Sequence, residues 1–82
     1  MERYRAEFLN SADAVRTIRD AVASVARECN VDEATVQDIR LAVSEAATNS
    51  VIHGRAPADA PLVVRVETTD VELCVVIHFA LA

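Results

Sequence analysis

The 82-residue sequence contains no lysine and no tryptophan, and it has only one glycine and two prolines. All eight basic residues are therefore arginines, against thirteen acidic residues, which gives a net charge of −5. An acidic balance without a basic patch argues against direct binding to nucleic acid. Because 52% of the residues are hydrophobic, the composition is that of a globular chain and not of a disordered one.

Long hydrophobic runs are also missing. The longest run, Cys74 to Ala82, is interrupted by His78 and is far too short to span a membrane. The charged start of the chain has no apolar stretch of the kind found in secretion signals. Cys29 and Cys74 stand far apart and match no metal or redox spacing, so we expect two buried thiols in a reducing compartment. These absences predict a soluble cytoplasmic protein without membrane contact.

The length allows one small domain, residues 1–82, which buries only about 60–65% of its unfolded surface and is marginal without a partner. Alternating side chains predict a strand over Glu2–Phe8. Apolar residues at three- and four-residue steps then predict a helix over Ala12–Cys29, with Asn10 or Ser11 as its N-cap.

A second helix is predicted from Asp32, a good N-cap, to Gly54, which follows its last turn. Its core stripe consists of Val36, Ile39, Val43, Ala46, Ala47 and Ser50. Leu41, Ala42 and Ile52 lie off this stripe, so more than half of the circumference is apolar. Such a helix is either covered on two sides or lines a pocket.

The remaining chain is predicted to form a loop and two strands. Arg55–Pro61 is the loop, Leu62–Thr69 the first strand, and Val71–Phe79 a second strand apolar enough for the centre of a sheet. A tight turn at Thr69 and Asp70 joins them. The order β-α-α-β-β indicates an α+β fold with two helices on one face of an antiparallel or mixed sheet.

The second helix also carries polar residues that share a face. Glu45, Asn49 and His53 follow one another at four-residue steps and therefore point the same way. Spacing alone favours an ordinary solvated stripe. The small or apolar neighbours Ala42 and Ala46 favour instead a face with room for a ligand.

The segment Asp38–Gly54, DIRLAVSEAATNSVIHG, resembles the N-box helix of the GHKL ATPases, and most closely the anti-sigma-factor serine kinase branch of the histidine-kinase-like ATPase superfamily. In that branch a Ser-Glu-Ala and a Thr-Asn precede an apolar pair and His-Gly or His-Ala. Here these are Ser44-Glu45-Ala46, Thr48-Asn49 and Val51-Ile52-His53-Gly54. The resemblance covers most of the chain but only the first part of such a domain, so it implies an incomplete Bergerat fold.

The resemblance implies a role for each polar residue. Asn49 would coordinate the Mg²⁺ of a bound Mg-ATP, and Glu45 would be the catalytic general base. His53 and Gly54 would line the nucleotide site. The implied protein partners are a sigma factor and an anti-anti-sigma factor whose serine is phosphorylated.

The sequence departs from the family pattern after the last strand. The family places an Asp-x-Gly-x-Gly motif there, whose Asp reads adenine, followed by a glycine-rich lid. Here Phe79 or its neighbours occupy that place, no carboxylate follows Glu72 and no glycine follows Gly54. This departure argues against Mg-ATP binding by the chain as given.

Three functions therefore remain open. The first is an anti-sigma-factor-like ATP-binding regulatory domain related to serine/threonine kinases. The second is a non-catalytic dimerisation or protein-binding module that has lost nucleotide binding. The third is a small α+β domain in which Glu45 and Asn49 are incidental. Because the last strand is expected to expose an edge, we also expect a homo-oligomer.

Overall fold

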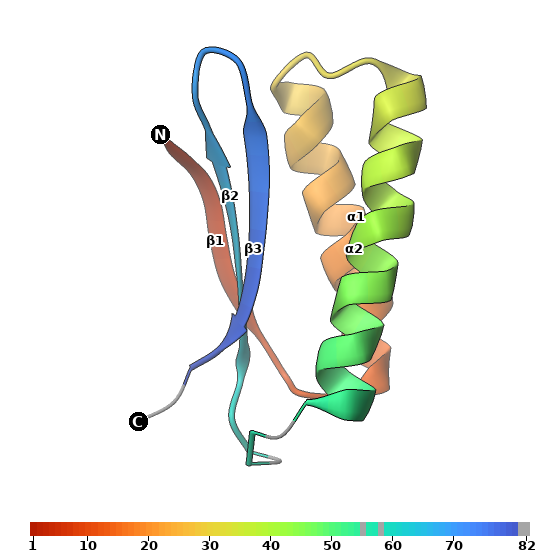
Figure 1. Cartoon of the computed structure of the whole chain (residues 1–82), viewed down its shortest axis with the longest axis vertical. Coiled ribbons are helices and arrows are strands. Elements are labelled where there is room, and N and C mark those ends of the chain that lie inside the picture. Colours follow the sequence, from red (N-terminus) through yellow and green to blue (C-terminus); the bar gives the residue numbers. More distant parts are fainter. Residues whose placement is uncertain (55, 58, 81–82) are drawn as a thin grey trace.

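The computed structural model describes residues 1–54, 56–57 and 59–80, and it confirms the predicted order of elements (Figure 1). The elements are β1 (Glu2–Phe8), α1 (Ala12–Glu28), α2 (Glu33–His53), β2 (Leu62–Thr68) and β3 (Leu73–Phe79). Both helices lie side by side on one face of the sheet. Within the predicted loop, Arg55 and Ala58 lie outside the described residues.

The sheet has the order β1-β2-β3, and both pairings are antiparallel. The central strand is β2, although the sequence of β3 is also apolar enough for that place; in the described part of the chain β3 is an outer strand, as the expectation of an exposed edge requires. Four of the seven residues of β2 are buried: Leu62, Val64 and Val66 face the helices, and Val63 is buried on the opposite face between its neighbours. In contrast, β3 is half-buried along most of its length.

The core lies between this sheet and the two helices. Ile18 and Val22 of α1 are fully buried against β2, as the periodicity predicts. Ser11 occupies the N-cap of α1 but makes no side-chain capping hydrogen bond. Cys29 follows the helix and does not belong to it. The sequence pattern thus gives the buried face of α1 correctly and its end to within one residue.

The two cysteines differ from the expectation of two buried thiols. Cys29 is half-buried beside the core, and Cys74 is exposed. Cys74 is exposed because it alternates with Leu73 and Val75, which face the helices, so its own side chain projects from the uncovered face of the sheet.

Candidate functional site

The start of α2 is fixed by two sets of polar contacts. The Asp32 carboxylate accepts hydrogen bonds from the backbone N–H of Thr35 at 3.2 Å and from its hydroxyl at 2.7 Å, which lowers the pKa of Asp32. Glu33 pairs with Arg27 of α1 at 2.8 Å and accepts a hydrogen bond from Gln37. These partners lower the pKa of Glu33 to about 2. The Glu33–Arg27 pair joins the start of α2 to the last turn of α1, and the burial of Val36, Val43 and Ala47 sets the rotation of α2.

This rotation turns one face of α2 to the core and leaves the opposite face in solvent. Val36, Val43 and Ala47 are buried, whereas Leu41 and Ile52 are 64% and 63% exposed. The helix is therefore covered on one side only. Of the three apolar residues off the core stripe, Ala42 lines an apolar groove on the flank of the helix, whereas Leu41 and Ile52 do not.

Glu45, Asn49 and His53 are all exposed residues of α2, so the expectation that they point to one side of the helix agrees with the structure. A shallow hollow of about 350 Å³ lies on this face, and its lining consists of Ser44, Glu45, Thr48 and Asn49. All four residues belong to α2, so Glu45 and Asn49 are neighbours there through their four-residue spacing. His53 does not line the hollow.

Gly54 lies at the end of α2, next to Phe79 of β3. It ends α2 with φ −67° and ψ 144°, a conformation open to any residue. Its backbone N–H donates to the Ser50 carbonyl at 3.1 Å. A Cβ atom at this position would overlap the Ser50 carbonyl oxygen and lie 2.6 Å from Cζ of Phe79. The Ser50 carbonyl oxygen, a backbone atom, is thus the closest obstacle to a side chain here, and the Phe79 ring is the next.

The apolar groove lies between α2 and β3 and has a volume of about 420 Å³. Its lining consists of Ile39, Ala42, Val43, Ala46 and Ser50 of α2 and Leu73, Val75 and Ile77 of β3. Ala46 is three residues before Asn49, and Ala42 is three residues before Glu45, so the polar stripe borders the groove. Sequence reasoning found the small residues of the helix but not the strand that forms the other wall.

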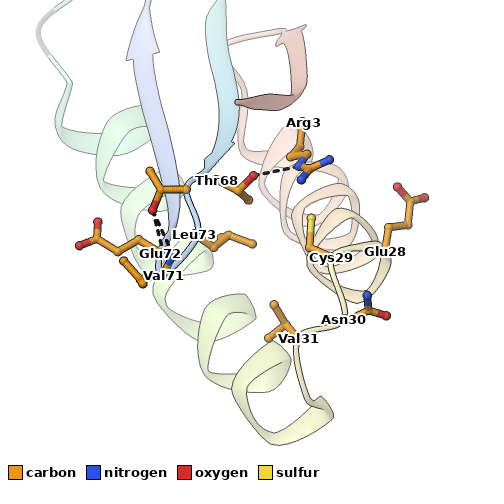
Figure 2. A pocket seen from close by; sticks show the side chains of 10 residues that line it. Arg3, Glu28, Cys29, Asn30, Val31, Thr68, Val71, Glu72 and Leu73 are labelled. Atoms are coloured by element: carbon orange, nitrogen blue, oxygen red, sulfur yellow. Dashed lines mark hydrogen bonds between the residues drawn. The ribbon is translucent and has the colours of Figure 1, made fainter.

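A larger hollow of about 490 Å³ lies at the other end of the molecule, where the α1–α2 connection meets the β2–β3 turn (Figure 2). Three of its polar side chains, those of Arg3, Thr68 and Thr69, are already engaged. Arg3 donates to the Thr68 hydroxyl at 2.8 Å, and the Thr69 hydroxyl accepts from the backbone N–H groups of Val71 and Glu72. These contacts explain the turn, and none of the predicted site residues lies there.

Two absences among the described residues bear on the site. Over residues 1–54, 56–57 and 59–80, no group of three or more His, Cys, Asp or Glu side chains is placed to hold a metal ion. In the same part of the chain, neither helix combines the length and the apolarity needed to cross a bilayer.

Comparison with known proteins gives one match. The description of the matching family is histidine kinase-like ATPase domain, and the match covers residues 8–78. Neither the curated proteins nor the solved structures contain a significant match. The matched region includes both helices, β2 and almost all of β3, so it spans the hollow and the groove as well as the core. From the fold and this match, the chain belongs to the histidine kinase-like ATPase domain family.

Proposed function

We propose that this domain binds a nucleotide with Mg²⁺ along α2 and serves as a regulatory ATPase-type domain of the anti-sigma-factor serine kinase type. The observation that carries the proposal is the pairing of Glu45 and Asn49 at one hollow. Both side chains lie on the free face of a helix whose other face is packed into the core. Membership in the family supports nucleotide binding in general.

The oxygen atoms available at the hollow fit Mg²⁺ bound to a nucleotide. Mg²⁺ prefers hard oxygen ligands and commonly takes only one or two from the protein, with phosphates and water completing its shell. Asn49 offers one neutral amide oxygen, and Glu45 stands one helical turn away. When bound, the ion would neutralise and orient the phosphate oxygens. The chain itself would supply Asn49 as the ligand.

Glu45 is suited to accept a proton at the same hollow. A carboxylate next to the phosphates can take the proton of an attacking hydroxyl, which in this type of kinase belongs to a serine of an anti-anti-sigma factor. Its exposure on α2 leaves room for such a partner. His53 and Gly54 extend the site toward the end of the helix, and a sigma factor would be the second partner. We expect such a protein to act in the cytosol.

The base of the nucleotide would lie toward the apolar groove, past Ala42 and Ala46. At the end of β3 the family carries an aspartate that reads adenine, whereas this chain has Phe79. A pocket that lacks this hydrogen-bonding group discriminates poorly between bases. We therefore expect Mg-ATP and Mg-GTP to bind with affinities within about tenfold of each other, a difference of roughly 1.4 kcal/mol.

The test is calorimetric titration of the chain with Mg-ATP. Asn49→Ala should abolish the binding heat, whereas Gln37→Ala, which removes an exposed amide from an earlier turn of α2, should leave it unchanged. Glu45→Gln should still bind and should lose any phosphoryl transfer to a serine-bearing partner. A wild-type chain that gives no binding heat, or an Asn49→Ala variant that binds normally, would overturn the proposal.

A further inference from the structure

The two edges of the sheet differ in their protection against pairing with another strand. In the described part of the chain, β1 and β3 are the outer strands. Four of the seven residues of β1 are charged, and its register is irregular between Glu2 and Tyr4. The seven residues of β3, LCVVIHF, include no charged residue, glycine or proline. Charges and irregularities normally prevent edge pairing, so β1 is protected and β3 is open.

The open edge of β3 continues into an apolar surface. Leu73, Val75 and Ile77 point to the helix side of the sheet, where they form one wall of the groove below α2. The other wall carries Ala42 and Ala46, whose small side chains leave the groove unfilled. In the described part of the chain, the outer edge of β3 and the apolar groove therefore lie along the same border.

The accessible surface of the chain is larger than that of a compact monomer of the same mass. The accessible surface is 5315 Å², whereas a compact monomer of 8.9 kDa exposes about 4,800 Å². The excess is about 500 Å² per chain. Two copies that each covered this area would bury about 1,000 Å² in total, which reaches the lower limit for a specific protein interface.

We propose that two copies of this chain pair through their β3 strands to form one continuous six-stranded sheet. A two-fold axis perpendicular to the sheet makes the new pairing antiparallel and keeps all four helices on the same face. Each groove then meets the corresponding border of the other copy. The sheet side chains that face the helices meet only apolar neighbours across the axis.

The sequence of β3 is complementary to itself in one register. Val76 is the central residue of Leu73–Phe79, so a pairing centred there sets Val76 opposite Val76 of the second copy. Val75 then lies opposite Ile77, Leu73 opposite Phe79 and Cys74 opposite His78. No pair opposes like charges, which would destabilise it. The β3 strand of a second copy therefore matches this edge residue by residue. For this reason we prefer a second copy of the chain to an unrelated strand as the partner.

Sedimentation equilibrium on the full chain, without nucleotide, tests the proposal independently of the proposed function. The wild type should sediment at about twice 8.9 kDa at micromolar concentrations. Val76→Lys and Val76→Glu each set like charges opposite each other at the axis and should raise the dimer dissociation constant by roughly tenfold or more. Glu7→Lys places a new charge on β1, the other edge, and should leave the dimer intact.

Mixing the two Val76 variants tests the register. The introduced lysine of one copy would face the introduced glutamate of the other, so the mixture should recover a one-to-one dimer although each variant alone is monomeric. Circular dichroism and amide exchange of the monomeric variants establish that they are folded. In the wild type, the β3 amides that point away from β2 should exchange slowly, and in Val76→Lys they should exchange fast.

Three results would overturn the proposal. The first is a wild type that stays monomeric at about 100 μM, a concentration at which an interface of this size should associate. That outcome would leave the groove to a strand of another protein or to a further segment of a longer chain. The second is a dimer that survives both Val76 variants but is lost in Glu7→Lys. The third is a mixture of the two variants that remains monomeric.

Discussion

Replacing Gly54 by alanine tests the contact that joins the end of α2 to the end of β3. The backbone of Gly54 lies in an ordinary extended region, so alanine adds no conformational strain. The added Cβ would overlap the Ser50 carbonyl oxygen and approach Cζ and Cε2 of Phe79 to 2.6 and 2.8 Å. Because the first of these atoms is backbone, the end of the helix must move.

The expected change in the free energy of unfolding has two opposing parts. Overpacking costs about 1–3 kcal/mol. Alanine also restricts the unfolded chain more than glycine does, which stabilises the folded state by about 0.4–1 kcal/mol and offsets part of this cost. With the middle of each range, the net destabilisation is about 1.3 kcal/mol. In a domain of this size each kcal/mol lowers the melting temperature by about 4–8 °C, so we expect a decrease of roughly 5–10 °C.

Urea unfolding of four chains measures this effect: the wild type, Gly54→Ala, Phe79→Leu and the double variant. If the ring contributes to the clash, the smaller leucine should relieve part of the cost, and the double variant should be more stable than the sum of the single changes predicts. A Gly54→Ala variant as stable as the wild type would refute the reasoning, because it would mean that the helix end and the ring move apart freely.

Three further changes test other parts of the structure. Leu62→Ala in β2, whose side chain is fully buried, should cost about 2–5 kcal/mol in urea unfolding, whereas Leu41→Ala, at an exposed site, should change stability by no more than about 0.5 kcal/mol. The pKa of Glu33 lies at about 2 in the folded chain against 4.5 as its ordinary value, so its stabilising contribution is complete above pH 4.5 and is lost as the pH falls toward 2. Unfolding at pH 6 and pH 3 should therefore show a smaller acid loss for Glu33→Gln, and an equal loss would contradict the ion pair with Arg27. Asn49→Ala should keep wild-type stability while it loses Mg-ATP binding, and a large drop in melting temperature would instead give Asn49 a structural role.

The sequence predicts the local structure well because its signals are local. The periodic positions of Ile18, Val22, Val36 and Val43 identify the buried faces of both helices, and Asp32 marks the start of α2 as its contacts with Thr35 confirm. Each of these signals depends on residues within a few positions of one another. The order of the elements follows from the same patterns.

The place of each strand in the sheet could not be predicted in the same way. Both β2 and β3 are apolar, and nothing in either strand says which of them pairs on two sides. The central place of β2 follows from its pairing with β1, a contact between distant parts of the chain. The exposure of Cys74 and the contact of Gly54 with Phe79 also depend on such long-range placement.

The proposed nucleotide site and the proposed dimer interface use the same groove, and this overlap links the two. A nucleotide base placed past Ala42 and Ala46 would occupy the surface that a second copy covers. Ligands that compete for one surface weaken each other by equal factors. Mg-ATP should therefore shift the dimer toward monomer in sedimentation experiments, and the shift should disappear in Asn49→Ala. A dimer that Mg-ATP strengthens would place the base outside the groove, with the second copy completing the wall of the nucleotide site.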